Sequence, residues 1–182
     1  MRSADARIRP ATRVGTLNCL ASVLNVADVK VDVVARNTLT LFADAATLFE
    51  RHSGVVAPAT TSDAPIAKEQ LASTCLGHAV AIPHTRITGL NAAVAALVRL
   101  KEPLAFGGPD DEPVEPVTLF VFLSVPHRAT QGDPETLAEI AEMLSDRTVR
   151  DRLGHDGDAD FVYATIAHWM PLGAIGPPDR RP

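Results

Sequence analysis

The chain has 182 residues, of which 46% are hydrophobic and 21% are charged. It is therefore long enough for one domain with a substantial core, and its composition is not that of a disordered protein. Its net charge is −5 at pH 7 and only 4% of its residues are aromatic. These values argue against nucleic acid as its main partner, and no basic face indicates a membrane surface.

The two cysteines, Cys19 and Cys75, lie far apart and form no CxxC pair. This usage is typical of a reducing compartment rather than of a disulfide framework or a zinc site. No apolar run approaches the roughly 18 residues of a membrane span, and no secretory cleavage pattern follows the arginine-rich start. We therefore expect a cytoplasmic protein. Its expected parts are a flexible extension over residues 1–14, a domain over residues 15–170 and a loose tail over residues 171–182.

The first third of the chain carries signals for two helices and a strand. Residues 17–24 have helical spacing over two turns, and residues 29–33 alternate between apolar and polar side chains as a half-buried strand does. Asn37 or Thr38 is a suitable N-cap for a helix that runs to about His52.

The segment that follows predicts a helix, a loop and a short strand. Asp63, with a proline two residues later, indicates an N-cap and a helix that ends near Ser73. Residues 73–79 contain a glycine and no clear period, which indicates a loop. Residues 80–83 form a short apolar run that ends in proline, as expected for an extended segment.

The centre of the chain predicts the sheet. Apolar residues alternate over 92–100, as in a strand facing a core, and residues 106–116 are rich in Gly, Pro and acids, as in a polar loop or hairpin. The nearly continuous apolar run over residues 117–125 is typical of a central strand covered on both faces.

The last third predicts helices. Asp133 is followed by proline and glutamate, the pattern of an N-cap and an acidic first turn, and Asp146 is a cap for a short helix to Leu153. That short helix carries Arg147, Arg150 and Arg152 on its polar side. A final helix is expected over residues 159–169. The predicted fold is a single α/β (α+β) domain, in which a mixed central β-sheet of three or four strands is flanked by helices on both faces.

Among the six histidines, His84 has the most distinctive context. It lies where the apolar run over residues 80–83 ends, and Pro83 stiffens the backbone before it. Side chains at the ends of rigid elements are held well enough for chemistry. From this pattern alone, a reactive histidine and a structural histidine bonded to a neighbouring carbonyl are both open.

The stretch STCLGHAVAIPHTRI over residues 73–87 resembles the phosphohistidine signature of the fructose/mannitol-type enzyme IIA domains (EIIA type 2) of the bacterial phosphotransferase system (PTS). It is most similar to the nitrogen-regulatory (Ntr) branch of that family. The likeness extends through residues 97–100, 116–126 and 140–147 and covers most of residues 17–170.

The resemblance implies a phosphohistidine phosphocarrier, a transferase component if it is active, with His84 as the phosphoacceptor and with no cofactor or metal. The implied donor is an HPr-like phosphocarrier protein, either HPr or its Ntr counterpart, and the implied role is regulation of other proteins by contact. Such a site needs a neutral imidazole and donors for the phosphoryl oxygens. The supporting residues would be Lys68, Ser73, Thr74, Gly77, His78, Thr85, Arg86 and Asp133.

Three positions depart from the family pattern. Lys68 replaces an arginine, so it offers a point charge in place of a bidentate donor, or simply a solvated helix face. Thr85 replaces a glycine that permits a positive φ or a close approach, although its hydroxyl can donate. Asp133 stands where many members have a second histidine. A carboxylate there would repel a phosphoryl group, unless it only caps its own helix.

These departures support a second hypothesis, a divergent, non-phosphorylated paralogue that acts as a regulatory protein-binding module. A metal site at His78 and His84, with Asp133, is a third hypothesis, although His-x5-His is not a recognised ligand spacing. Cys75 as a nucleophile would have no paired base except His84, so we expect it to pack in a loop.

Overall fold

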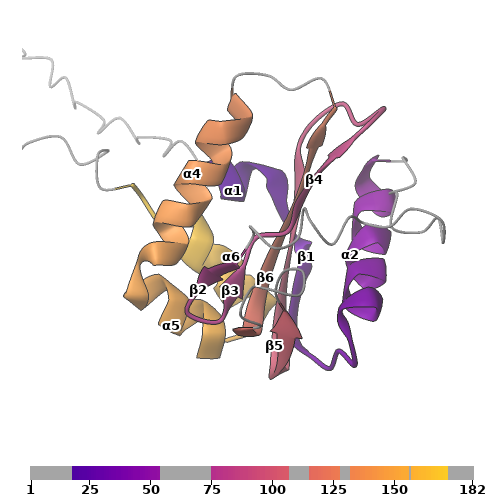
Figure 1. Ribbon diagram of the computed structural model, residues 1–182. Coiled ribbons are helices and arrows are strands. Elements are labelled where there is room, and N and C mark those ends of the chain that lie inside the picture. The colour runs from indigo at the N-terminus through magenta and orange to yellow at the C-terminus, as the bar shows by residue number, and fades with distance from the viewer. Residues whose placement is uncertain (1–17, 54–74, 107–114, 128–131, 156, 172–182) are drawn as a thin grey trace, which may run out of the picture.

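The structure, a computed structural model, describes residues 18–53, 75–106, 115–127, 132–155 and 157–171. Within this part of the chain, six strands form one mixed sheet in the order β1-β5-β6-β3-β2, and β4 also pairs with β6 (Figure 1). The strands are β1 (Leu24–Val33), β2 (Cys75–Gly77), β3 (Val80–Ala81), β4 (His84–Ile87), β5 (Val94–Phe106) and β6 (Glu115–Pro126). The helices are α1 (Cys19–Val23), α2 (Thr38–Ser53), α4 (Gly132–Ser145), α5 (Arg147–His155) and α6 (Ala159–Ala167).

Strand β6 lies at the centre of the sheet. It pairs antiparallel with β5 on one side, and on the other side it pairs parallel first with β3 and then with β4. Every side chain from residue 119 to residue 125 is buried. The central strand predicted over residues 117–125 is therefore confirmed, and the reason is that apolar residues face both layers of the protein.

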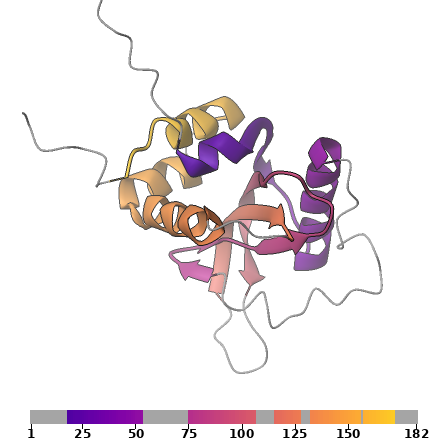
Figure 2. The ribbon, with the colours of Figure 1, turned by 90° about the horizontal axis from the view of Figure 1, so that it is seen from above.

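Helices cover both faces of the sheet, as predicted, and Figure 2 shows the two layers from above. On one face, Leu41 and Leu48 of α2 pack against Phe120 and Phe122 of β6. On the other face, side chains of α1, α4, α5 and α6 pack against the odd-numbered residues of β6. These helix residues include Leu20, Ile140, Leu153 and Ile166, and their strand neighbours include Leu119, Val121 and Leu123.

Two of the predicted helix caps are confirmed. The Oδ1 atom of Asn37 accepts from the Thr40 N–H at 2.9 Å at the start of α2, and that of Asp146 accepts from the Thr148 N–H at 2.8 Å at the start of α5. Helix α4 begins at Gly132, so Asp133 lies in the first turn and not at the N-cap.

Other predictions were wrong. The loop expected over residues 73–79 contains strand β2, which a tight turn folds back onto β3. The backbone reverses through three successive left-handed residues, Gly77 (φ 73°), His78 (φ 54°) and Ala79 (φ 64°). Strand β4 was also missed, so the sheet has more strands than the three or four expected. Both strands are too short for a hydrophobic period to show.

Some expectations lie outside the described residues: the helix over 63–73, most of the loop over 106–116, the extension over 1–14 and nearly all of the tail from 171. Among the helices that the structure describes, none is long and apolar enough to cross a membrane.

Candidate functional site

His84 is the first residue of β4 and is paired with Leu123 of the central strand. The backbone just before it is also tied to that strand, because the Leu123 N–H donates to the Pro83 carbonyl oxygen at 2.9 Å. Pro83 itself is buried, whereas the His84 side chain is exposed. An exposed imidazole is thus mounted on a backbone that the core of the sheet holds in place.

The tautomer of His84 follows from one contact. Its Nδ1 atom lies 3.1 Å from the carbonyl oxygen of Ile82. Because a carbonyl oxygen only accepts, Nδ1 carries the proton of the neutral ring and Nε2 carries the lone pair. The two interpretations that the sequence left open are therefore compatible. Nδ1 is bonded to a carbonyl oxygen, and Nε2 of the same ring is the nitrogen that can react.

Alternation along β4 sorts the neighbours of His84. His84 and Arg86 pair with Leu123 and Val125, so both side chains point to the face of the sheet that α4 covers. Arg86 is exposed and lies about 7 Å along the strand from His84. The structure thus brings a guanidinium group and an imidazole to one face.

Thr85 lies between them and points to the opposite face, where its partner in β6 is Ser124. Its exposed hydroxyl is not directed to the same face as His84. Within a strand, the backbone is extended and suits any residue, so threonine in place of the family glycine introduces no backbone strain here.

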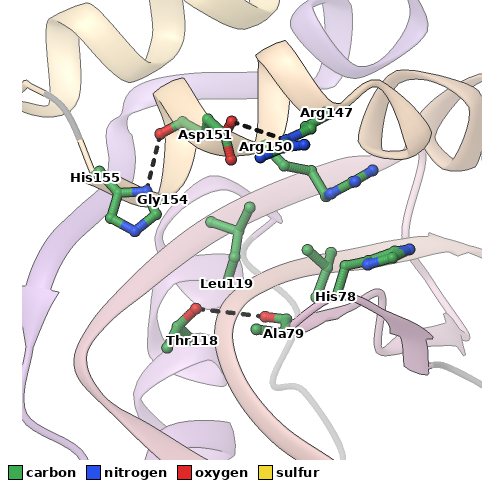
Figure 3. A pocket seen from close by; sticks show the side chains of 10 residues that line it. His78, Ala79, Thr118, Leu119, Arg147, Arg150, Asp151, Gly154 and His155 are labelled. Atoms are coloured by element: carbon green, nitrogen blue, oxygen red, sulfur yellow. Dashed lines mark hydrogen bonds and ion pairs between the residues drawn. The ribbon is translucent and has the colours of Figure 1, made fainter.

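Gly77 and His78 lie at the other end of the edge formed by β3 and β4. Val80, just after this turn, pairs with Leu119 of β6, whereas His84 pairs with Leu123 of the same strand. These two partners are four residues apart, which is about 13 Å along a strand. His78 is exposed and lies beside α5, as Figure 3 shows. The structure therefore does not bring it to His84.

The remaining predicted site residues are Lys68, Ser73, Thr74 and Asp133. The first three lie outside the described residues. The backbone of Asp133 is in the first turn of α4, but its side chain is outside the described part of the chain. Their roles at the site therefore stay predictions.

The structure also bears on the two other hypotheses, a metal site and a cysteine nucleophile. Among the described residues, no group of three or more His, Cys, Asp or Glu side chains is placed to hold a metal ion. Cys75 is half-buried in β2 and packs against the core under α2, with its Sγ atom 4.0 Å from the carbonyl oxygen of Phe106. This position agrees with a packing role.

Sequence reasoning missed one feature, a cavity between the turn at His78 and the polar side of α5 (Figure 3). Arg147 and Arg150 were recognised as a polar face. However, nothing local in the sequence indicates that this face lies opposite a turn some 70 residues earlier in the chain.

Comparison with known proteins identifies the family. Residues 22–169 match the EIIA 2 domain of the phosphoenolpyruvate-dependent sugar phosphotransferase system. A crystal structure of the nitrogen regulatory protein IIA-Ntr from Neisseria meningitidis superposes with a TM-score of 0.69 at 34% identity, covering 80% of this chain and 97% of that chain. The chain therefore belongs to the PTS EIIA 2 family, as its resemblance to that family predicted.

Named relatives support the Ntr likeness. A nitrogen regulatory protein of Pseudomonas aeruginosa is 40% identical over 101 residues, 56% of this chain and 64% of its own. Another, of Bradyrhizobium diazoefficiens, is 33% identical over 100 residues, 55% of this chain and 63% of its own. The matched regions thus span just under two thirds of these relatives' length.

A more distant likeness concerns the fold alone. A putative PTS IIA (PtxA) of Streptococcus mutans superposes with a TM-score of 0.53 at 17% identity, covering 78% of this chain and 87% of that chain.

Proposed function

We propose that this protein is a cytoplasmic, nitrogen-regulatory phosphocarrier of the phosphotransferase system. His84 accepts a phosphoryl group from an HPr-like carrier protein, and the two phosphorylation states bind regulated partner proteins differently. The observation that carries the proposal is the contact between His84 Nδ1 and the Ile82 carbonyl oxygen, at 3.1 Å. It leaves Nε2 as the nucleophile of an exposed imidazole.

The transfer step needs little else from the protein. The Nε2 lone pair attacks the phosphorus of the donor's phosphohistidine, the new N–P bond forms, and the donor's N–P bond breaks with its electron pair returning to the donor imidazole. Nδ1 of His84 keeps its proton, so the carbonyl oxygen of Ile82 also stabilises the positive charge that the ring gains.

Arg86 is the charged neighbour that the fold supplies on the same face. Its guanidinium group offsets part of the negative charge of the phosphoryl oxygens as the donor approaches. The other supporting groups that the family resemblance suggests are Lys68, Ser73 and Thr74, and they belong to the proposal.

Phosphoryl transfer from radiolabelled phosphoenolpyruvate through purified upstream carriers tests the proposal. Wild-type protein should be labelled and His84→Ala should not. His127→Ala is the matched control, because His127 is also exposed and lies at the end of β6, where its N–H donates to the Ile87 carbonyl oxygen at 3.0 Å. Labelling of His84→Ala, or an unlabelled wild type beside a labelled family member, would contradict the proposal.

The same assay addresses the alternative of a non-phosphorylated binding module. If the carboxylate of Asp133 blocks the site, wild-type protein stays unlabelled and Asp133→His gains label at His84. Glu135→Gln, an exposed acid in the same helical turn, is the control and should leave labelling unchanged.

A further inference from the structure

We propose that the protein has a second ligand site, which binds a small organic anion with an apolar body. The site is a cavity of about 530 Å³ between the turn that joins β2 to β3 and the polar side of α5 (Figure 3), and we call it the α5 pocket. Its volume lies within the roughly 300–1,000 Å³ of small-molecule sites. It is distinct from the site at His84, about 13 Å further along β6.

The floor of the α5 pocket is apolar and fixed. Val80 and Leu119 line it, and each is 2% exposed. They are also register partners in the parallel pairing of β3 with β6, so the main-chain bonds of the sheet hold the floor in place. A planar or aliphatic group placed on this floor would contact both side chains and take its own apolar surface out of water.

The rim of the α5 pocket is basic. Arg147 and Arg150 come from α5, and His78 comes from the turn. Asp151 is the only acid among the described residues that line the pocket, and its Oδ2 atom lies 3.6 Å from Nε of Arg147. Two guanidinium groups and one carboxylate leave a positive balance, which favours an anion.

Arg150 is held in position for such a ligand. One of its terminal nitrogens donates to the Leu144 carbonyl oxygen at 2.8 Å, which fixes the side chain at the end of α4. The rest of the guanidinium group still offers N–H donors. Figure 3 shows this group and the imidazole of His78 turned toward the same side of the pocket. A carboxylate or phosphate between them would receive donors from two elements.

The opposite end of the pocket has a different character. His155 lies there, and its Nδ1 atom is 3.1 Å from the Asp151 carbonyl oxygen (Figure 3). Nδ1 therefore donates, and Nε2 of the neutral ring is an acceptor. The ligand thus places its anionic group at the end formed by Arg150 and His78, and its apolar body over Leu119.

The backbone of the turn is strained where it shapes the pocket. His78 and Ala79 have φ angles of 54° and 64°, which residues with a side chain rarely adopt. The strain is maintained because the carbonyl oxygen of Ala79 accepts from the N–H groups of Thr118, at 2.9 Å, and Leu119, at 3.1 Å. Such strain is concentrated at functional sites, and here it sets the position of the His78 side chain.

The test uses the full chain, labelled with ¹⁵N and followed by NMR, and three probes that separate the components of the ligand. Phenyl phosphate carries both the apolar ring and the anion, phenol carries only the ring, and inorganic phosphate only the anion. Phenyl phosphate should shift the amide signals of residues 78–80, 118–119 and α5. It should bind at least about tenfold more tightly than either partial probe. Benzoate in a further titration distinguishes a carboxylate ligand from a phosphate ligand.

A pair of variants makes the result specific. The double variant Arg150→Gln/His78→Asn should weaken phenyl phosphate binding at least about tenfold, and asparagine is chosen because it tolerates a left-handed backbone. Arg152→Gln is the matched control. It removes the same charge from the same helix, but Arg152 does not line the pocket and lies over the Phe161 ring instead.

Three outcomes would overturn the proposal: no binding of phenyl phosphate at about 10 mM, shifts confined to other residues, or equal losses in the double variant and the control. A hexaglutamate peptide that shifts the same signals at lower concentration than phenyl phosphate would also overturn it, because the pocket would then be a docking site for an acidic protein segment.

Discussion

The Nδ1 atom of His84 lies 3.1 Å from the carbonyl oxygen of Ile82, two residues earlier in the chain. Ile82 is 4% exposed, and the residue after it is bonded to the central strand through its carbonyl oxygen. Ile82 thus lies between Ala81, which pairs with β6, and Pro83, which is bonded to β6, and these two attachments set the direction of the Ile82 carbonyl. In this way the core of the protein decides which ring nitrogen of His84 can react.

This geometry predicts the chemical form of the phosphorylated protein. The phosphoryl group should be bonded to Nε2 of His84, because Nδ1 is occupied by a proton directed at the Ile82 carbonyl oxygen. NMR of ¹⁵N-histidine-labelled phosphoprotein distinguishes the two isomers by the nitrogen that couples to phosphorus. Coupling to Nδ1 would show that the ring turns over before transfer.

The fold could be predicted from the sequence where elements are long and periodic. The run over residues 117–125 and the helix that Asn37 caps carry strong local signals, and both are present. The short strands β2 and β4 are different, because they have three and four residues and are stabilised by pairing with β3 and β6. Pairing between segments distant in sequence leaves no local period.

At the candidate site too, local sequence signals predicted some features, and features that depend on tertiary structure could not be predicted. The position of His84 after a buried run and a proline marked it in the sequence. Which face of the sheet Thr85 and Arg86 occupy could not be predicted, because the sequence did not show that β4 exists. The α5 pocket was hidden for a similar reason, since His78 and Arg150 meet only through the tertiary structure.

Asn18 connects the two ends of the described chain, and its replacement should destabilise the protein. Its Oδ1 atom accepts from the Ala21 N–H at 2.9 Å, and its Nδ2 donates to the carbonyl oxygens of Ile166 at 2.6 Å and Trp169 at 3.1 Å. Asn18→Ala should lower the free energy of unfolding by about 2–3 kcal/mol, measured by urea denaturation.

Asn37→Ala is the matched control for Asn18→Ala, because Asn37 caps α2 with an exposed side chain and should lose only about 1 kcal/mol. Asn18→Asp separates the two roles further. It keeps the cap but directs a carboxylate at two carbonyl oxygens, so it should be no more stable than Asn18→Ala. Equal losses at positions 18 and 37 would show that the buried amide contacts contribute nothing.

Arg99 is a buried cation that donates to main-chain oxygens. It donates to the carbonyl oxygens of Gly157 at 2.9 Å and Leu153 at 3.3 Å, and it lies 3.4 Å from a carboxylate oxygen of Asp32. Arg99→Met leaves those oxygens without this donor and should lower the free energy of unfolding by about 2–4 kcal/mol.

The ion pair itself should contribute little, because the Asp32 side chain is 70% exposed. Asp32→Asn tests this, and asparagine also tolerates the φ of 56° at this position. Urea denaturation should show a loss of less than about 1 kcal/mol for Asp32→Asn. A loss as large as that of Arg99→Met would mean that the carboxylate, and not the carbonyl oxygens, holds the arginine.

The left-handed turn predicts opposite effects for two small substitutions. Ala79→Gly should raise the free energy of unfolding by about 0.5–1 kcal/mol, because glycine adopts a φ of 64° without steric cost. Gly77→Ala should lower it by about 1–2 kcal/mol, although an added Cβ would meet no atom within 4 Å, because its φ is 73°. Thermal and urea unfolding measure both. A neutral Gly77→Ala would show that this turn relaxes when it is substituted.

Cys19 should react slowly with alkylating agents. Burial of its thiol, and secondly its hydrogen bond with Glu139, raise the pKa of the thiol above the ordinary value, so the reactive thiolate is scarcer at any given pH. In a Cys75→Ser background, mass spectrometry of iodoacetamide labelling against pH should place the midpoint above that of a free cysteine.

Glu139→Gln should lower the midpoint and speed labelling at pH 8, because it removes the negative charge while keeping an acceptor for the Cys19 N–H. Glu142→Gln, one turn further along α4, should leave the rate unchanged. If Glu139→Gln has no effect either, burial alone sets the pKa.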